Sequence, residues 1–98
     1  MISLKLLREF WDQHPGAERP LREWYKTATA AAWKSLEDLR GTYSHADGVR
    51  TKRGETLTVF NIGGNKYRLI ARIRYDYQLV NIRHVLTHKG YDEGKWKE

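Results

Sequence analysis

The feature that most restricts the fold is a series of three apolar, β-branched segments in the second half of the chain, separated by two very short turns. Strands are predicted over 56–62 (TLTVFNI), 66–75 (KYRLIARIRY) and 79–86 (LVNIRHVL). The intervening residues are Gly63-Gly64-Asn65 and Asp76-Tyr77-Gln78, and the glycine pair is typical of a hairpin turn. Because connections this short join antiparallel neighbours, the sequence predicts an antiparallel meander.

The first half of the chain has helical periodicity instead. One apolar stripe repeats at spacings of three and four until Pro15-Gly16, which ends the helix, and Ser3 is its candidate N-cap. A second stripe follows Pro20, a residue that suits a first helical position. The stripes consist of Leu4, Leu7, Trp11 and His14 in the first helix and of Leu21, Trp24, Ala28 and Ala31 in the second.

Shorter segments complete the pattern. Ser35 and Asp38 resemble a capping box for a short helical turn that Gly41 ends. Residues 1–3 are a candidate for a short leading strand, and the polar, basic stretch 44–55 is predicted to be a mobile connection. Helices followed by a meander indicate one α+β domain over residues 1–98, with the N-terminal helices packed on one face of a small, mainly antiparallel sheet.

Composition excludes several classes of protein. The chain has no cysteine, which rules out a disulfide framework, a cysteine zinc site and a thiol nucleophile. It has no apolar run of the ~18 residues that a membrane span needs, and no signal segment, so we expect a cytoplasmic protein that does not enter a membrane. Trp11, Trp24 and Trp33 are expected to pack in the core, and a base-stacking platform is the alternative.

Positive charge is concentrated in the second half. Residues 1–49 hold seven basic and seven acidic residues, whereas residues 50–98 hold eleven and five, which accounts for the whole net charge of +6. A one-sided basic surface favours a polyanionic partner such as nucleic acid, and an ordinary basic soluble domain is the alternative.

Strand parity gathers part of this charge on one sheet face. In the strand over 66–75, one set of alternating residues is apolar and belongs against the helices, and the other is mainly basic. The apolar set is Tyr67, Leu69, Ala71, Ile73 and Tyr75, and the basic set is Lys66, Arg68, Ile70, Arg72 and Arg74, which Arg83 joins in a suitable register. Such an uncovered row of guanidiniums suits phosphate groups, and the alternative is a solvated face that discourages edge pairing.

The stretch 87–92 (THKGYD) is predicted to be a loop that displays chemically useful side chains. His88 is a candidate for proton transfer, Tyr91 for stacking on a base or assisting a proton transfer, and Lys89 for supplying positive charge. These groups suit metal-free RNA cleavage, in which a ribose 2′-hydroxyl attacks the adjacent phosphate. His14 and His84 are expected to be structural, and two separate histidines do not make a metal site.

Two sequence blocks carry a resemblance to a known family. They are VFNIGGNKYRLI over 59–70 and IRHVLTH over 82–88, the latter followed by Tyr91-Asp92. Upstream, LREFW over 7–11 with His14-Pro15, and AWKS over 32–35 with Asp38-Leu39, are also similar. The chain resembles the HigB family of toxins, within the RelE-like superfamily of bacterial type II toxin–antitoxin systems.

The resemblance implies a compact RelE-like fold and an endonuclease that cuts messenger RNA, often on the ribosome. It implies a HigA-type helix-turn-helix antitoxin, through which the complex binds operator DNA, and it implies no metal or cofactor. By the same resemblance, Arg68, His88 and Tyr91 are the candidate catalytic residues, without assignment of base and acid. Phosphate-binding candidates are Lys66, Arg72, Arg74, Arg83 and Lys89. The alternative is a basic RNA- or ribosome-binding module that blocks translation without cutting.

Overall fold

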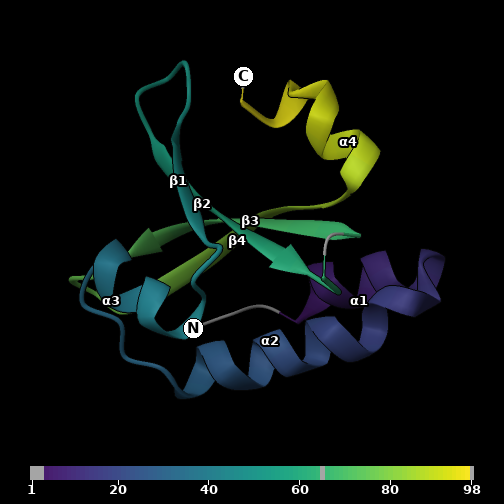
Figure 1. Cartoon of the computed structure of the whole chain (residues 1–98), viewed down its shortest axis with the longest axis horizontal. Coiled ribbons are helices and arrows are strands. Elements are labelled where there is room, and N and C mark those ends of the chain that lie inside the picture. The colour runs from purple at the N-terminus through teal and green to yellow at the C-terminus, as the bar shows by residue number, and fades with distance from the viewer. Residues whose placement is uncertain (1–3, 65, 98) are drawn as a thin grey trace.

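The computed structural model describes residues 4–64 and 66–97, and it confirms the α+β class. Its elements in chain order are α1 (Lys5–Gln13), the 3₁₀ turn η1 (Pro15–Ala17), α2 (Glu18–Ala30), α3 (Leu36–Thr42), β1 (Asp47–Arg50), β2 (Thr56–Ile62), β3 (Tyr67–Arg74), β4 (Leu79–Thr87), α4 (His88–Glu93) and the 3₁₀ turn η2 (Lys95–Lys97). The strands form one antiparallel sheet in the order β1-β2-β3-β4. Helices α1 and α2 lie on one side of this sheet and α4 lies on the other (Figure 1).

The N-terminal helices differ from the prediction mainly at their ends. Helix α2 begins at Glu18, two residues before Pro20, because the first turn of a helix leaves its N–H groups unbonded and so accommodates a proline. Gly41 lies inside α3 and does not end it. The Ser35 cap is confirmed: its hydroxyl accepts a hydrogen bond from the Asp38 N–H at 3.2 Å. The predicted Ser3 cap and leading strand lie outside the described residues.

The main core fills the space between the sheet and the helices. Phe60 is at its centre, with its ring 5.3 Å from those of both Trp24 and Tyr43. Trp11, Trp24 and Trp33 are buried in this cluster, so their predicted core role is confirmed. The apolar set of β3 also packs on this side, as strand parity predicts. No helix in 4–64 or 66–97 is long and apolar enough to cross a membrane.

The predicted mobile connection over 44–55 is wrong in its central part. It contains β1, in which Val49 pairs with Leu57 of β2. The two strands form a hairpin whose turn is closed by a 2.8 Å bond from the Thr51 N–H to the Glu55 carbonyl. Gly54 adopts φ +84° in this turn, a conformation that favours glycine. Since Val49 is the one β-branched residue of β1, the sequence offers little signal for this strand beyond the glycine in the turn that follows it.

A β-bulge interrupts the pairing of β3 with β4. Ile70 pairs with His84 and Ala71 with Ile82, so Arg83 is the extra residue. Val80, Ile82 and Val85 all pack against the main core, although a regular strand would place Val85 on the opposite face from the other two. The bulge therefore keeps both halves of β4 in register with the core and sets the direction of Arg83.

Candidate functional site

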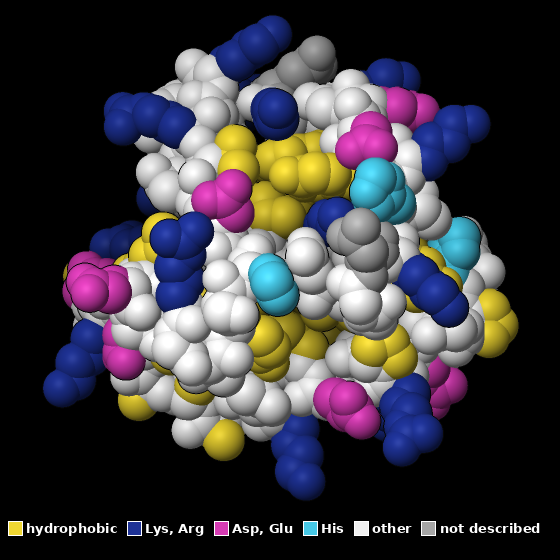
Figure 2. Space-filling view, in the orientation of Figure 1, with side chains coloured by type: hydrophobic (Ala, Val, Ile, Leu, Met, Phe, Trp, Pro, Cys, Tyr) yellow, Lys and Arg dark blue, Asp and Glu magenta, His cyan; other side chains and the backbone are white. Residues whose placement is uncertain are grey.

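The sheet face opposite α1 and α2 carries the candidate site. We refer to it as the outer face, which includes Val59, Arg68, Ile70, Arg72 and Leu86. The prediction that this face is uncovered is wrong, because α4 and η2 pack on it. A second apolar cluster is buried there, consisting of Leu57, Val59, Ile70 and Trp96 with the partly buried Val49, Leu86 and Tyr91. Figure 2 shows an apolar hollow between the β1–β2 hairpin and α4, with Lys, Arg and His side chains near its rim.

The predicted loop over 87–92 is also wrong, since residues 88–93 form α4. The Thr87 hydroxyl caps the helix by accepting a 3.1 Å hydrogen bond from the Gly90 N–H, and Gly94 ends it with φ +74°. These boundary residues are the available sequence signal, because six residues are too few to show a helical period. Helical spacing places His88, Tyr91 and Asp92 on one side of α4.

Arg68 and Tyr91 are brought together at the base of α4. Arg68 is 8% exposed, its Nη1 donates to the Tyr67 carbonyl at 3.1 Å, and its Cζ lies 5.3 Å from the centroid of the Tyr91 ring. Because a guanidinium stacked on an aromatic ring loses little freedom on binding an anion, this arrangement suits a positioned phosphate-binding group.

Trp96 also packs on Tyr91, and sequence reasoning missed it. The two rings are stacked with centroids 5.2 Å apart, and the Trp96 Nε1–H donates to the Tyr91 carbonyl at 3.0 Å. Trp96 lies in the short η2 turn, where no periodicity marks it as a packing residue. Tyr91 is therefore in contact with both a buried indole and the Arg68 guanidinium.

His88 forms a pair with Asp92, four residues later on α4. Its Nδ1 lies 2.9 Å from Asp92 Oδ2, and its side chain is about half exposed. A carboxylate on Nδ1 favours the tautomer with the proton on that nitrogen, which leaves Nε2 to exchange a proton with a substrate. The His88 backbone N–H donates to the Lys66 carbonyl at 3.1 Å, so α4 starts beside the beginning of β3. Asp92 was predicted only as part of a motif, and the structure gives it this contact.

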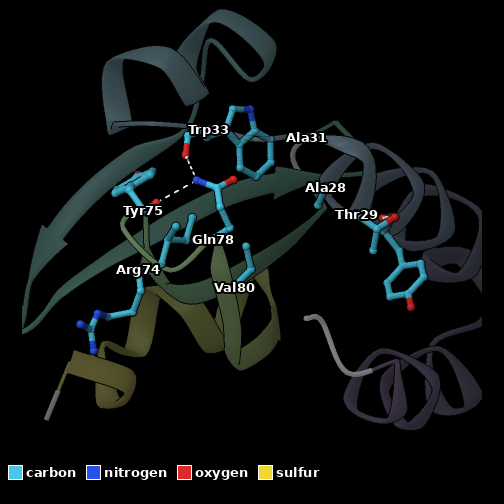
Figure 3. A pocket seen from close by; sticks show the side chains of 10 residues that line it. Ala28, Thr29, Ala31, Trp33, Arg74, Tyr75, Gln78 and Val80 are labelled. Atoms are coloured by element: carbon cyan, nitrogen blue, oxygen red, sulfur yellow. Dashed lines mark hydrogen bonds between the residues drawn. The ribbon is translucent and has the colours of Figure 1, made fainter.

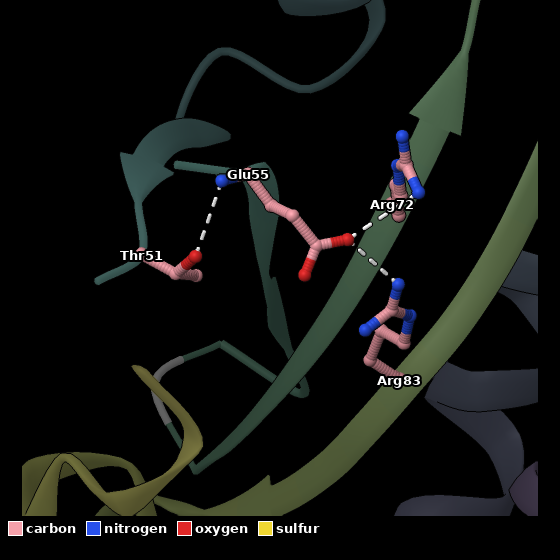
Figure 4. A network of polar contacts seen from close by, with 4 residues as sticks. All are labelled: Thr51, Glu55, Arg72 and Arg83. Carbon is pink, nitrogen blue, oxygen red and sulfur yellow. Dashed lines mark hydrogen bonds and ion pairs between the residues drawn. The ribbon is translucent and has the colours of Figure 1, made fainter. Parts of the chain in front are cut away.

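The remaining predicted phosphate-binding residues fall into separate groups. Lys66 is exposed and lies beside His88 through the backbone contact. Lys89 is exposed on α4 but follows His88 directly, so it faces another side of the helix. Arg72 and Arg83 both contact Glu55 on the outer face (Figure 4).

Arg74 is separated from the rest of the group. It lies six residues along β3 from Arg68, which is about 20 Å in an extended strand. Its Nη2 contacts Asp76 Oδ2 at 3.3 Å, and its Cζ lies 4.7 Å from the Tyr77 ring centroid. The hydrogen bond from Arg74 lowers the pKa of the Asp76 carboxyl. The structure therefore places Arg74 at the far end of the sheet.

Comparison with known proteins identifies the family. The family model HigB_toxin, described as the RelE-like toxic component of a toxin–antitoxin system, matches residues 17–94. This chain belongs to the HigB toxin family. It is 30% identical over 92 residues to the mRNA interferase toxin HigB of Escherichia coli strain K12, an alignment that covers 94% of this chain and 86% of the relative. The same values hold for the proteins named mRNA interferase HigB of Escherichia coli O157:H7 and of Shigella flexneri.

The matched region of this toxin includes Arg68, His88 and Tyr91 and ends at Gly94. Trp96, which supports Tyr91, lies beyond it. His84 lies within it, on the outer face beside Arg83, and is partly buried. Burial, and secondarily the charge of Arg83, lower the pKa of His84, so the neutral imidazole is favoured at neutral pH. The structural role expected for His84 stays a prediction.

A pocket of the toxin lies away from this site. It has a volume of about 220 Å³, and its walls include Tyr25, Ala28, Trp33, Tyr75 and Val80 (Figure 3). Gln78 closes one side, with its Nε2–H₂ group donating to the carbonyls of Trp33 at 2.9 Å and Tyr75 at 2.8 Å. Because its lining includes neither His88 nor Tyr91, the pocket is not a candidate for the RNA site.

Proposed function

We propose that this toxin cleaves messenger RNA on its outer face, with Arg68, His88 and Tyr91 at the reacting phosphate. The observation that carries the proposal is the proximity of two assemblies, the His88–Asp92 pair and the Arg68–Tyr91–Trp96 stack. Both depend on α4, which places His88 and Tyr91 on one side of the helix. Membership of the HigB family and the mRNA interferase activity named for its relatives support the same reaction.

The proposed reaction is an internal transfer of a phosphoryl group. The 2′-oxygen of a ribose attacks the adjacent phosphorus and the bond to the 5′-oxygen breaks, which leaves a 2′,3′-cyclic phosphate and a 5′-hydroxyl. One proton leaves the 2′-hydroxyl and one reaches the 5′-oxygen, and His88 and Tyr91 are the groups proposed for these transfers. Arg68 stabilises the negative charge that develops on the phosphate oxygens, and its position is already fixed by the Tyr91 ring.

The family description also implies a partner. As the toxic component of a toxin–antitoxin system, this protein has an antitoxin. We propose that the antitoxin is a helix-turn-helix protein of the HigA type, and that operator DNA binds the toxin only through that complex. We propose further that cleavage takes place in the cytoplasm, on messenger RNA bound to the ribosome.

The test compares the wild type with two variants during induced expression, with sequencing of RNA 5′ ends. The wild type is expected to arrest growth and to give new 5′-hydroxyl ends inside reading frames. His88→Ala is expected to lower cleavage by about 10²- to 10⁴-fold, the usual effect of losing a group that transfers a proton. His45→Ala is the matched control, because His45 is an exposed histidine in the loop between α3 and β1. It should behave as the wild type.

Two results would contradict the proposal. Full cleavage by a folded His88→Ala protein would remove His88 from the site. Growth arrest without new RNA ends in any strain would favour a protein that binds RNA or the ribosome and blocks translation without cutting.

A further inference from the structure

Glu55 is an isolated negative charge in the most basic part of the chain. Between Asp47 and Asp76 it is the sole acidic residue, whereas that interval holds seven basic ones: Arg50, Lys52, Arg53, Lys66, Arg68, Arg72 and Arg74. A surface glutamate without specific partners would be surrounded by solvent. The structure instead places it on the outer face, against two of the residues predicted to bind phosphate.

Two guanidiniums converge on one oxygen of this carboxylate (Figure 4). Glu55 Oε2 lies 3.3 Å from Arg72 Nη1 and 2.9 Å from Arg83 Nη2. The Glu55 side chain is 25% exposed, and those of Arg72 and Arg83 are 45% and 35% exposed. The three groups carry a combined charge of +1, because one carboxylate neutralises only one of the two positive charges of the arginines. Both arginines remain accessible to a ligand.

The positions of the three side chains are set by separate backbone features. The hairpin turn fixes Glu55, whose N–H donates to the Thr51 hydroxyl at 3.3 Å and whose carbonyl accepts from the Thr51 N–H. The alternation of side chains along β3 places Arg72 on the outer face. Arg83 reaches the same face because it is the extra residue of the β-bulge in β4. Two strands and the turn of the β1–β2 hairpin thus contribute to one charged cluster.

We propose that Arg72 and Arg83 form a second phosphate site for the substrate RNA, and that the Glu55 carboxylate occupies this site in the free toxin. The inference rests on the proposed function, since it concerns the RNA that the Arg68 site cleaves. Arginine binds carboxylate and phosphate oxygens with the same geometry, so an RNA phosphate competes directly with Glu55. Glu55 therefore lowers affinity for polyanions and selects for RNA that makes the other contacts as well.

The second site contacts a phosphate other than the scissile one. Arg68 and Arg72 are four residues apart on the same face of β3, which corresponds to about 13 Å. The buried Ile70 lies between them. A single RNA strand that passes from Arg68 to Arg72 is held at two separated phosphates. These two contacts fix the path of the strand across the outer face.

The test measures RNA affinity without cleavage. The probe is a fluorescein-labelled 2′-O-methyl oligoribonucleotide, which has no free 2′-hydroxyl to react, and the readout is fluorescence anisotropy at several salt concentrations. Glu55→Gln is expected to bind about fivefold more tightly at low salt, with an advantage that shrinks as salt rises. Glu18→Gln is the matched control, because it removes the same charge from an arginine pair, Glu18 with Arg22 at 2.7 Å, on the remote helix α2.

A second set of variants tests whether Glu55 acts through the two arginines. Arg83→Gln is expected to weaken binding and to reduce the slope of log affinity against log salt by about 0.7, the value for one phosphate of a single strand. In an Arg72→Gln, Arg83→Gln background, adding Glu55→Gln should have no larger effect than adding Glu18→Gln. Thermal unfolding of each variant shows whether it is folded.

The outcomes separate this inference from the proposed function. Equal affinities for Glu55→Gln and Glu18→Gln, or weaker binding by Glu55→Gln, would overturn the second phosphate site while leaving cleavage at Arg68 intact. Loss of cleavage by Glu55→Gln at unchanged affinity would place the carboxylate in the reaction and would also overturn it. Failure of the proposed function appears in the His88→Ala comparison instead.

Discussion

The two faces of the sheet are covered in very different ways. On the helix side, α1, α2 and α3 enclose a cluster of fourteen buried residues among those described, including Phe60, Trp24 and Leu69. On the outer face, α4 and η2 cover a cluster of four, in which Trp96 is the largest side chain. Buried apolar area is the main favourable term in folding, so the helix side supplies most of the stability.

The smaller cluster has another use. It is large enough to hold ten residues of chain on the sheet, and those residues carry His88, Tyr91 and Asp92. The charged groups remain beside it, partly exposed, instead of being covered by a second full layer. The difference shows how one sheet combines a stable core on one face with an accessible ionic surface on the other.

The largest expected effect is on the helix side. Phe60→Ala removes a ring that contacts Trp24, Trp33 and Tyr43, and it should lower the free energy of unfolding by about 3–5 kcal/mol. Urea denaturation measures this, and hydrogen exchange should become faster on both faces of the sheet because global unfolding is easier. Phe60→Leu should lose less, and a similar loss in both variants would show that volume at this position matters little.

An intermediate effect is expected on the outer face. Trp96→Ala removes the stack on Tyr91, so RNA cleavage should fall about tenfold or more through loss of position. Amides of residues 88–97 should exchange faster, whereas those of β2 and β3 should be unchanged, because α4 and η2 detach locally. Trp96→Phe keeps a stacking ring and serves as the control. A loss of global stability as large as that of Phe60→Ala would abolish the distinction between the two faces.

The smallest expected effect concerns pH. Since burial lowers the pKa of His84, the unfolded chain takes up a proton at this residue more readily than the folded toxin. The free energy of unfolding should therefore fall as pH decreases through about 6.5, the unperturbed value, and this component should be absent from His84→Gln. Urea denaturation of both proteins at pH 8 and pH 5.5 checks the sign. A difference between them that is independent of pH would contradict the assignment.

Much of the fold follows from local patterns. Alternation in β2 and β3 with short turns was sufficient to predict the meander, and helical spacing placed Trp11 and Trp24 in the core. The hairpin strand β1 was missed because Val49 is its one strongly apolar residue. The strand is defined by its backbone pairing with β2, which no local pattern in β1 shows. The bulge at Arg83 was not predictable, because it depends on how the rest of β4 packs against the core.

The site was predictable in its residues more than in its arrangement. Arg68, His88 and Tyr91 came from parity and from the family resemblance, and their catalytic roles stay predictions. The sequence did not show that Arg68 is buried or that α4 brings the Tyr91 ring over it, because both depend on how the end of the chain folds back on the sheet. Nor did it pair Glu55 with Arg83, which is 28 residues away and reaches it through two strand pairings and a bulge.

The order of the residues along the chain has a consequence for synthesis. Translation proceeds from the N-terminus, so every buried residue of the helix-side core is made before His88, Tyr91 and Trp96. A 3.3 Å hydrogen bond from the Lys52 N–H to the Lys97 carbonyl, which joins the hairpin turn to η2, forms later still. The proposed nuclease site is therefore completed by the last residues of the chain to be synthesised.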